Sequence, residues 1–285
     1  MIESFDTQLE ILVEAALKED VGDGDHSTIA SIPADAMGKA VLKIKEAGIL
    51  AGVEVAEKIF KLKYTGTVFN KKMNDGDPMK PGDVAFDVEA PVHVILQCER
   101  LVLNCMQRMS GIATLTAKYS EKLKGYHSRI LDTRKTTPNF RVLEKEAVRI
   151  GGGFNHRMGL YDMIMLKDNH VDYSGGIENA IRKAHAYVQT KKPGLKIEIE
   201  TRSLDEVKTV LEIGLVDRIM LDNFSPADLD EAVRLIGNRY ETEASGGINL
   251  DNIIEYAKTN VDFISVGALI HQARSLDLSL KAVKA

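Results

Sequence analysis

Strand-like and helical patterns alternate through the second half of the chain, and this alternation narrows the folds it can adopt. Short apolar runs predict strands, helical periodicity fills the segments between them, and each unit takes roughly 20–35 residues. Repeated strand–helix units call for a parallel sheet covered by helices, and their even spacing favours closure into a small barrel over an open sheet. The predicted strands are Arg129–Leu131, Asp162–Leu166, Leu195–Glu200, Asp217–Leu221, Tyr240–Ala244 and Asp262–Ser265, and the predicted helices are Phe140–Ile150, Gly176–Gln189, Leu204–Ile213, Pro226–Ile236 and Leu250–Lys258.

The first half has a different pattern. An amphipathic helix is predicted over Thr7–Lys18, followed by a turn-rich stretch, Glu19–Thr28. Alternating strands are predicted at Lys39–Lys45 and Val84–Val88, then a long helix from Val92, and the tail Leu276–Val283 alternates like a returning strand. We therefore predict an α/β protein with an N-terminal α+β sandwich domain over residues 1–110, joined by the tail 273–285, and an α/β barrel domain over 111–272.

Composition excludes several classes of function. The chain has 285 residues, a net charge of −5, no tryptophan and 6% aromatic residues, which argues against a basic, base-stacking surface for nucleic acid. No apolar stretch approaches the ~20 residues of a membrane span. The N-terminal residues lack the basic segment and following apolar run that are typical of a signal peptide. We expect a cytoplasmic protein that binds no membrane. Cys98 and Cys105 are expected to be reduced core thiols, too far apart along one helix for a disulfide.

A basic cluster contrasts with this acidic composition. Between Asp132 and His170 the chain carries nine basic side chains around the three glycines Gly151–Gly153, which suggests a small, multiply anionic ligand. Any one of these cations alone is best explained as a solvated surface charge, but several near one end of the predicted barrel favour a site. The hydroxyls of Thr136 and Thr137 can add donors. The candidate cations are Arg134, Lys135, His156, Arg157 and Lys167.

Carboxylates occur at the ends of neighbouring predicted strands. Glu198 and Glu200 share one face of a strand otherwise suited to burial, where they are costly unless paired with cations or a metal. Asp222 ends the next strand. Because active sites of parallel barrels form at the carboxyl ends of the strands, Glu200 and Asp222 are candidates to hold Mg²⁺. A strand-end cap or an ion pair is the alternative.

Two loops of small residues follow the last two predicted strands. Ser245-Gly246-Gly247 and Ser265–Ala268, which contains Gly267, each stand between a strand and a helix, where backbone amides form a cradle for an anion. Phosphate sites recur after the last strands of such barrels. His271 lies about one helical turn further and can reach the same cradle or serve as a surface or capping residue.

Arg100 lies in the long predicted helix, with Leu96 and Leu103 a turn away on either side. A helix that is apolar on two faces is buried or sits at a subunit contact, and an arginine on such a face needs an anionic partner. That partner can belong to a ligand or to protein.

These residues stand in segments that resemble the quinolinate phosphoribosyltransferase family, also called carboxylating nicotinate-nucleotide pyrophosphorylases. The segments follow the family's order across nearly the whole chain. Asn139-Phe140 replaces the usual Gly-Leu before Arg141, and Phe154 stands where histidine is frequent, so the shape of that loop is where this chain departs from the family. The matching segments are Glu19–Asp25, Glu99–Asn104, Ser110–Thr114, Asp132–Pro138, Gly151–Gly153, His156-Arg157, Gly159-Leu160, Lys167–His170, Glu198–Glu200, Leu221–Phe224, Ser245–Gly247 and Ser265–Ala268 with His271.

The resemblance implies an N-terminal α/β sandwich domain and a C-terminal incomplete TIM-like barrel. It implies transfer of a phosphoribosyl group from 5-phosphoribosyl 1-pyrophosphate to quinolinate with decarboxylation, giving nicotinate mononucleotide, pyrophosphate and carbon dioxide for NAD biosynthesis. It also implies a homodimer, which can assemble further into a hexamer, with Arg100 entering the neighbouring site. Quinolinate would contact Arg100, Arg134, His156, Arg157 and Lys167. The phosphoribosyl donor would contact Lys135, His271, Ser245, Gly246, Gly247 and Gly267. Glu200 and Asp222 would hold Mg²⁺ and, together with Lys135, would act in catalysis.

Three other functions fit parts of the pattern. Lys167 can act as the nucleophile of a Schiff-base lyase, although the surrounding cations argue against it. The chain can be a phosphoribosyltransferase for a different acid, like the molybdenum-operon paralogs of the family. It can also be an anion-binding protein without catalysis, which needs the cradle but not the carboxylate pair.

Overall fold

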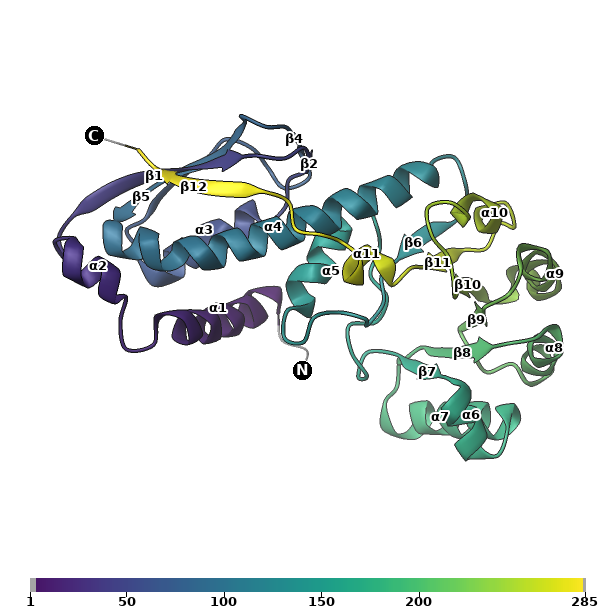
Figure 1. Cartoon of the computed structure of the whole chain (residues 1–285). Helices are drawn as coiled ribbons and strands as arrows, with labels where there is room; N and C mark the ends of the chain where they lie inside the picture. The colour runs from purple at the N-terminus through teal and green to yellow at the C-terminus, as the bar shows by residue number, and fades with distance from the viewer. Residues whose placement is uncertain (1–3, 284–285) are drawn as a thin grey trace. The chain divides into compact units, whose positions relative to one another are not determined.

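The computed structural model describes residues 4–283, and their contacts separate into two compact units (Figure 1). The first comprises the chain up to residue 117 together with 136–152 and the segment from 269 onward; the second comprises 118–135 and 153–268. The sequence-based boundaries placed all of 111–272 in one domain. The structure divides the chain differently because helix α5 (Arg141–Ile150) packs with α1 (Phe5–Val21) of the first unit.

An antiparallel sheet forms the centre of the first unit, in the order β12-β1-β5-β3. The C-terminal strand pairs with β1, with Leu42 opposite Leu280, so the tail forms the predicted strand with the N-terminal sheet. A separate two-stranded ribbon joins β2 and β4. The strands are β1 (Met37–Ile44), β2 (Gly48–Ile49), β3 (Val68–Lys71), β4 (Pro78–Met79), β5 (Val84–Pro91) and β12 (Leu278–Ala282).

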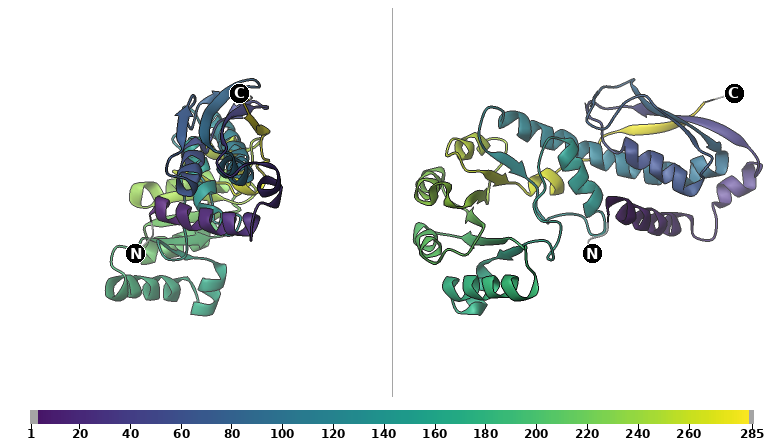
Figure 2. Two further views of the ribbon diagram at one scale, coloured as in Figure 1. Left: turned by 90° about the vertical axis from the view of Figure 1, so that its left-hand side faces the viewer. Right: turned by 180° about the vertical axis from the view of Figure 1, so that it is seen from behind.

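Helices α3 (Val53–Lys63) and α4 (Val92–Lys122) lie on one side of this sheet, as two views show (Figures 1 and 2). The core between them includes Phe60, which packs its ring edge-on to Phe86. Two sequence-based expectations are corrected here. Helix α3 was not predicted, and the stretch expected to be turns, Glu19–Thr28, contains the end of α1 and the start of α2 (His26–Ser31), whose first turn is capped by the carboxylate of Asp25.

A parallel six-stranded sheet forms the second unit, in the order β6-β11-β10-β9-β8-β7, and helices cover one of its faces (Figure 1). Within residues 4–283 the edge strands β6 and β7 do not pair, so the sheet stays open and the closure into a barrel expected from the strand spacing is wrong. The strands match the predicted positions to within about two residues: β6 (Arg129–Leu131), β7 (Ile164–Leu166), β8 (Ile197–Thr201), β9 (Arg218–Asp222), β10 (Glu241–Ser245) and β11 (Phe263–Ser265). The helices are α6 (Asp168–Ser174), α7 (Ile177–Lys191), α8 (Leu204–Ile213), α9 (Pro226–Ile236) with a short turn Gly237–Arg239, α10 (Ile253–Ala257) and α11 (Ala268–His271).

The two faces of this sheet differ in chemistry. Ile199, Ile219 and Ala244 lie on the face that packs on the helices, whereas the intervening residues Glu198 and Arg218 are partners in register on the other face. A curled parallel sheet therefore directs charged side chains into its own interior. No helix among residues 4–283 has the length and apolar character needed to cross a bilayer.

Candidate anion-binding active site

The predicted site residues of the second unit gather at the carboxyl edge of the parallel sheet. Lys167 follows β7 directly, Glu200 is the second-last residue of β8, Asp222 ends β9, and Ser245 ends β10. Because all six strands are parallel, these ends meet at one edge. This edge is where open α/β sheets and barrels bind ligands.

Lys167 and Glu200 form an ion pair across neighbouring strand ends. Nζ of Lys167 lies 3.1 Å from Oε2 of Glu200, and the lysine side chain is 47% exposed while the glutamate is 10% exposed. The Lys167 backbone N–H also donates to Nδ1 of His170 at 3.0 Å, which fixes the start of α6. The carboxylate thus anchors an ammonium group whose outer side stays accessible to a ligand.

The loop Ser245-Gly246-Gly247 is built on the end of β9. Asp222 accepts hydrogen bonds from the hydroxyl of Ser245 and from the amide of Asn223 at 2.6 Å, and the Asn223 backbone N–H donates to the Ser245 carbonyl at 2.8 Å. Gly246 has φ +91°, and any side chain there would overlap Asn223. The two strand ends and the loop therefore form one connected unit that only glycine permits.

Glu200 and Asp222 are engaged within the protein, Glu200 in the ion pair with Lys167 and Asp222 with Ser245 and Asn223. The ion-pair and strand-end alternative is therefore observed, and a cation between Glu200 and Asp222 stays a prediction. Both present carboxylate oxygens, which Mg²⁺ prefers, from adjacent strand ends on the same face of the sheet. Two protein carboxylates are a typical donor set for Mg²⁺, whose other ligands are water and substrate phosphates.

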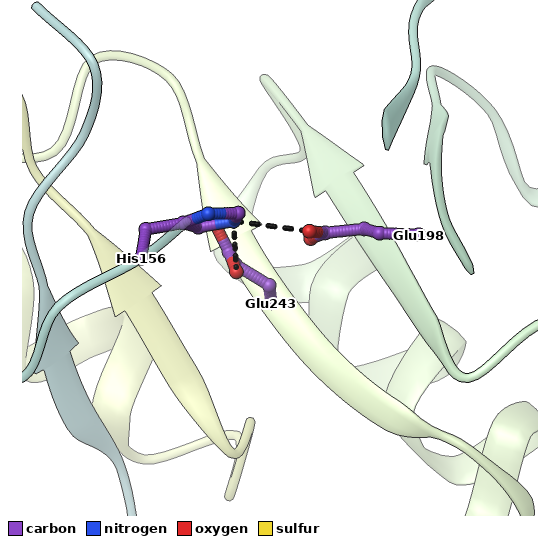
Figure 3. A group of neighbouring side chains, drawn as sticks. All are labelled: His156, Glu198 and Glu243. Atoms are coloured by element: carbon purple, nitrogen blue, oxygen red, sulfur yellow. Dashed lines mark ion pairs between the residues drawn. The ribbon is translucent and has the colours of Figure 1, made fainter. Parts of the chain in front are cut away.

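A second group of charges, which the sequence analysis recognised only in part, lies inside the curled sheet (Figure 3). Nε2 of His156 lies 3.0 Å from Glu198 and 3.3 Å from Glu243, and both glutamates are fully buried. Arg218 donates from Nη1 to Glu243 at 3.0 Å. Arg218 also donates from Nη2 to Glu241 at 2.9 Å, so two bases here face three carboxylates, two of which are fully buried.

The balance of charges shifts the pKa values of this group. Burial alone would lower the pKa of His156, but the two carboxylates favour the imidazolium and raise the pKa to about 9. The Arg157 backbone N–H lies 2.6 Å from Nδ1 and favours the neutral ring, yet two full charges outweigh one amide dipole. Burial and the charge of Glu243 raise the pKa of Glu198 to about 7, while His156 and Arg218 hold the pKa of Glu243 below its usual range against the effect of burial.

His156, Glu198 and Glu243 present three ligand-type atoms within 4.8 Å of one another, as a metal site would. Arg218 already neutralises Glu243, and a histidine must lose its proton to bind a metal. The group is therefore better described as a buried charge network. Glu243 and Arg218 were missed from the sequence, although the period-two pattern that identified Glu198 also occurs in Glu241–Ser245.

The segment that carries His156 runs beside the free edge of β6. Phe154 forms a parallel bridge with Leu131, and the buried carboxylate of Asp132 accepts from the His156 backbone N–H at 2.8 Å. Residues 24 apart in the chain are thereby joined at the carboxyl edge of the sheet. Phe154, one of the departures from the family pattern, packs under the guanidinium of Arg129 at 5.2 Å.

Two arginines lie close together beside this segment. Arg157 donates to the Met163 carbonyl at 3.1 Å, and its pKa is lowered first by burial and then by repulsion from Arg134. The carboxylates of Glu198 and Asp162 act on Arg157 in the opposite direction. Lys135 is exposed next to Arg134.

The loop that follows contains Asn139, which has φ +60°. Asparagine tolerates this left-handed conformation, which also explains why glycine is usual at this position in the family.

Arg100 and His271 belong to the first unit. Arg100 is exposed on α4, and His271 is exposed at the end of α11. Gly267 stands in the second unit, directly before α11. The structure thus brings together the predicted residues at the strand ends, and the contribution of Arg100 to a partner's site stays a prediction.

Fold and site together define a two-domain α/β protein with cationic groups, paired carboxylates and a glycine loop at one edge of a parallel sheet. Comparison with known families agrees with this class. Residues 25–110 match the N-terminal domain, and residues 112–281 the C-terminal domain, of quinolinate phosphoribosyl transferase. The chain belongs to the quinolinate phosphoribosyltransferase family.

Individual relatives cover nearly the whole chain. It is 44% identical, over 95% of its length and 81% of the relative's, to quinolinate phosphoribosyltransferase [decarboxylating] 1b of Nicotiana tabacum. It is 40% identical, over 96% of its length and 93% of the relative's, to a probable nicotinate-nucleotide pyrophosphorylase [carboxylating] of Bacillus subtilis. Among solved structures, NadC from Streptococcus pyogenes superposes with a TM-score of 0.90 at 40% identity and covers all of both chains.

Proposed function

We propose that this chain is a decarboxylating quinolinate phosphoribosyltransferase that uses 5-phosphoribosyl 1-pyrophosphate as donor. Family membership over both domains supports this proposal. The observation that carries it is the group at the carboxyl edge of the parallel sheet, where Lys167 lies 3.1 Å from Glu200 and Asp222 holds the glycine loop through Ser245. Arg134 and Arg157 stand in segments that follow the same edge. Quinolinate has two adjacent carboxylates, and arginine recognises a carboxylate through two parallel hydrogen bonds.

The reaction proceeds in two steps. The bond between the ring nitrogen of quinolinate and C1 of the ribose forms as the bond from C1 to pyrophosphate breaks, and pyrophosphate keeps that electron pair. The ring nitrogen is now cationic, so the bond from C2 to its carboxylate can break and carbon dioxide leaves. The electron pair left on C2 takes a proton from water, which gives nicotinate mononucleotide.

The residues contribute mainly position and charge. Arg134, Arg157 and Lys167 bind quinolinate. His156 belongs to the same assignment, but both of its ring nitrogens are engaged within the protein, so it contributes positive charge behind these groups rather than a hydrogen bond. Its carboxylate partners Glu198 and Glu243 keep it positively charged. Lys135 contacts the donor. The loop Ser245–Gly247 and Gly267 hold its 5-phosphate, and His271, four residues after Gly267, also contacts the donor.

Glu200 and Asp222 face the ribose, where negative charge stabilises the cationic C1 as pyrophosphate leaves. They would also hold Mg²⁺, which when bound neutralises charge on the pyrophosphate. The protein acts as a homodimer, which can form part of a hexamer. Arg100 of one copy completes the site of the other. The cytoplasmic location stays a prediction.

Release of carbon dioxide from carboxyl-labelled quinolinate tests the proposal. The purified chain should release label only with quinolinate and 5-phosphoribosyl 1-pyrophosphate together, with one pyrophosphate for each carbon dioxide. Turnover of nicotinate in place of quinolinate would indicate a relative with another acid substrate. Borohydride trapping of substrate on Lys167 would indicate a Schiff-base lyase, and binding without pyrophosphate release would indicate a binding protein.

A further inference from the structure

Another ion pair, with a buried carboxylate, lies in the first unit. Glu144 of α5 is fully buried, and Arg108 of α4 donates to its Oε1 from Nε at 3.0 Å and from Nη2 at 2.8 Å. A buried carboxylate is costly unless cations and hydrogen bonds surround it. The two side chains therefore hold α5 against α4 in one geometry.

Glu144 also holds the loop that precedes its own helix. The backbone N–H of Thr137 donates to Oε2 at 2.8 Å, and the Thr137 hydroxyl donates to Oε1 at 2.9 Å. The hydroxyl expected from the sequence to serve a ligand is thus directed to Glu144. Thr137 stands two residues after Lys135, so the carboxylate sets the backbone from which Lys135 projects.

Arg108 holds a second segment with the other side of its guanidinium. Nη2 donates to the Ile270 carbonyl at 2.8 Å and Nη1 to the Ala273 carbonyl at 2.5 Å, so the two acceptors stand on either side of His271 in the chain. The same segment lies directly on α4, since a side chain at Gly111 would overlap the carbonyl oxygen of Arg274. A residue 165 positions away in sequence is thereby tied to the helix.

We propose that Arg108 and Glu144 are positioning residues that set the affinity for the phosphoribosyl donor by fixing the two segments that carry Lys135 and His271. The inference rests on the proposed function, because that function assigns both residues to the donor. Arg108 and Glu144 themselves act through hydrogen bonds to backbone and to Thr137. Both segments are held by the same carboxylate–guanidinium pair. Loss of Glu144 frees Thr137 and leaves the guanidinium without its anchor, and loss of Arg108 frees the two carbonyls beside His271.

The test is the KM for each substrate, measured by carbon dioxide release with the full chain. Glu144→Gln and Arg108→Met should each raise the KM for 5-phosphoribosyl 1-pyrophosphate about tenfold, as expected for lost charge-assisted bonds. The KM for quinolinate should rise less, by about threefold, because Arg134 is the one assigned quinolinate contact on the released segment. Arg157 and Lys167 lie on other segments. Arg108→Lys should recover part of the loss, since an ammonium can meet Glu144 but cannot also hold two carbonyls.

Two further variants separate positioning from a merely structural role. Thr137→Val removes one hydroxyl bond and should stay folded, with a donor KM raised about threefold. Glu146→Gln is the matched control, because Glu146 pairs with Arg149 on the exposed side of the same helix, and both KM values should be unchanged.

A lower melting temperature in Glu144→Gln and Thr137→Val with a wild-type donor KM would overturn the proposal, as would an equal rise of both KM values. A wild-type chain that releases no carbon dioxide would contradict the proposed function instead. Calorimetric titration of wild type and Thr137→Val with 5-phosphoribosyl 1-pyrophosphate would then decide the inference. A higher dissociation constant for Thr137→Val than for the wild type would support the inference, and equal dissociation constants would refute it.

Discussion

Replacing Glu243 by glutamine should change how the stability of the protein depends on pH. In the wild type, Glu243 contacts Nε2 of His156 at 3.3 Å and Arg218 at 3.0 Å in a fully buried position. The substitution keeps the volume but removes the charge that both cations face. Removing one partner of a buried ion pair costs about 3–5 kcal/mol, so Glu243→Gln should lower the free energy of unfolding by a few kcal/mol at neutral pH.

The sign of the pH effect follows from His156. Its pKa is raised from 6.5 in an unfolded chain to about 9 in the folded one, and the largest opposing influence is burial. Stability from the imidazolium is therefore fully present below pH 6.5 and is lost as the pH rises through 9. At 1.36 kcal/mol per pKa unit, His156 by itself contributes a loss of about 3 kcal/mol across this window. Glu198, whose pKa is raised to about 7, adds to the loss at the lower end of the window. Glu243→Gln removes one of the two carboxylates that raise the pKa, so it should lose about half as much.

Urea unfolding at intervals between pH 6.5 and 9 measures both quantities, with the denaturant slope checked for constancy. His156→Asn should flatten the pH dependence, while the control His127→Asn, a 60% exposed imidazole, should leave it in place. Wild-type stability that stays constant across the window would refute the charge network as described. An equal slope in wild type and Glu243→Gln would show that Glu243 does not contribute to it.

Three other predictions concern the quinolinate contacts, the glycine loop and the buried cysteines. Arg134→Ala and Lys167→Ala should each weaken quinolinate binding more than tenfold, because a charge-assisted contact is worth about 2–3 kcal/mol; unchanged titrations in both would refute their assignment. Gly246→Ala should raise the donor KM, since φ +91° alone costs a non-glycine residue roughly 1–2 kcal/mol and the methyl group would overlap Asn223; a wild-type KM would contradict the proposed phosphate loop. Burial raises the pKa of Cys98 and Cys105 to about 12, so iodoacetamide at pH 8 should label neither until the chain is unfolded in urea, and mass spectrometry should show this.

Local patterns in the sequence predicted much of the second unit. Strand and helix periods in Leu195–Glu200 or Pro226–Ile236 depend on neighbouring residues, so their positions could be read along the chain. The parallel topology then required the strand ends to meet, which placed Lys167, Glu200 and Asp222 at one edge. Helix α3 was missed because packing of Phe60 in the core, rather than a strong end signal, decides it.

The sequence by itself determined the alternation of strands and helices, the charged ends of the strands and the family, because each is written in short stretches of neighbouring residues. Only the tertiary structure decided which charges meet. His156 finds Glu243 inside the sheet, and Glu144 takes the Thr137 hydroxyl that otherwise looked free for a ligand. Nothing local marks such partners, since a buried charge is neutralised by whichever residue the packing brings near, at any distance along the chain.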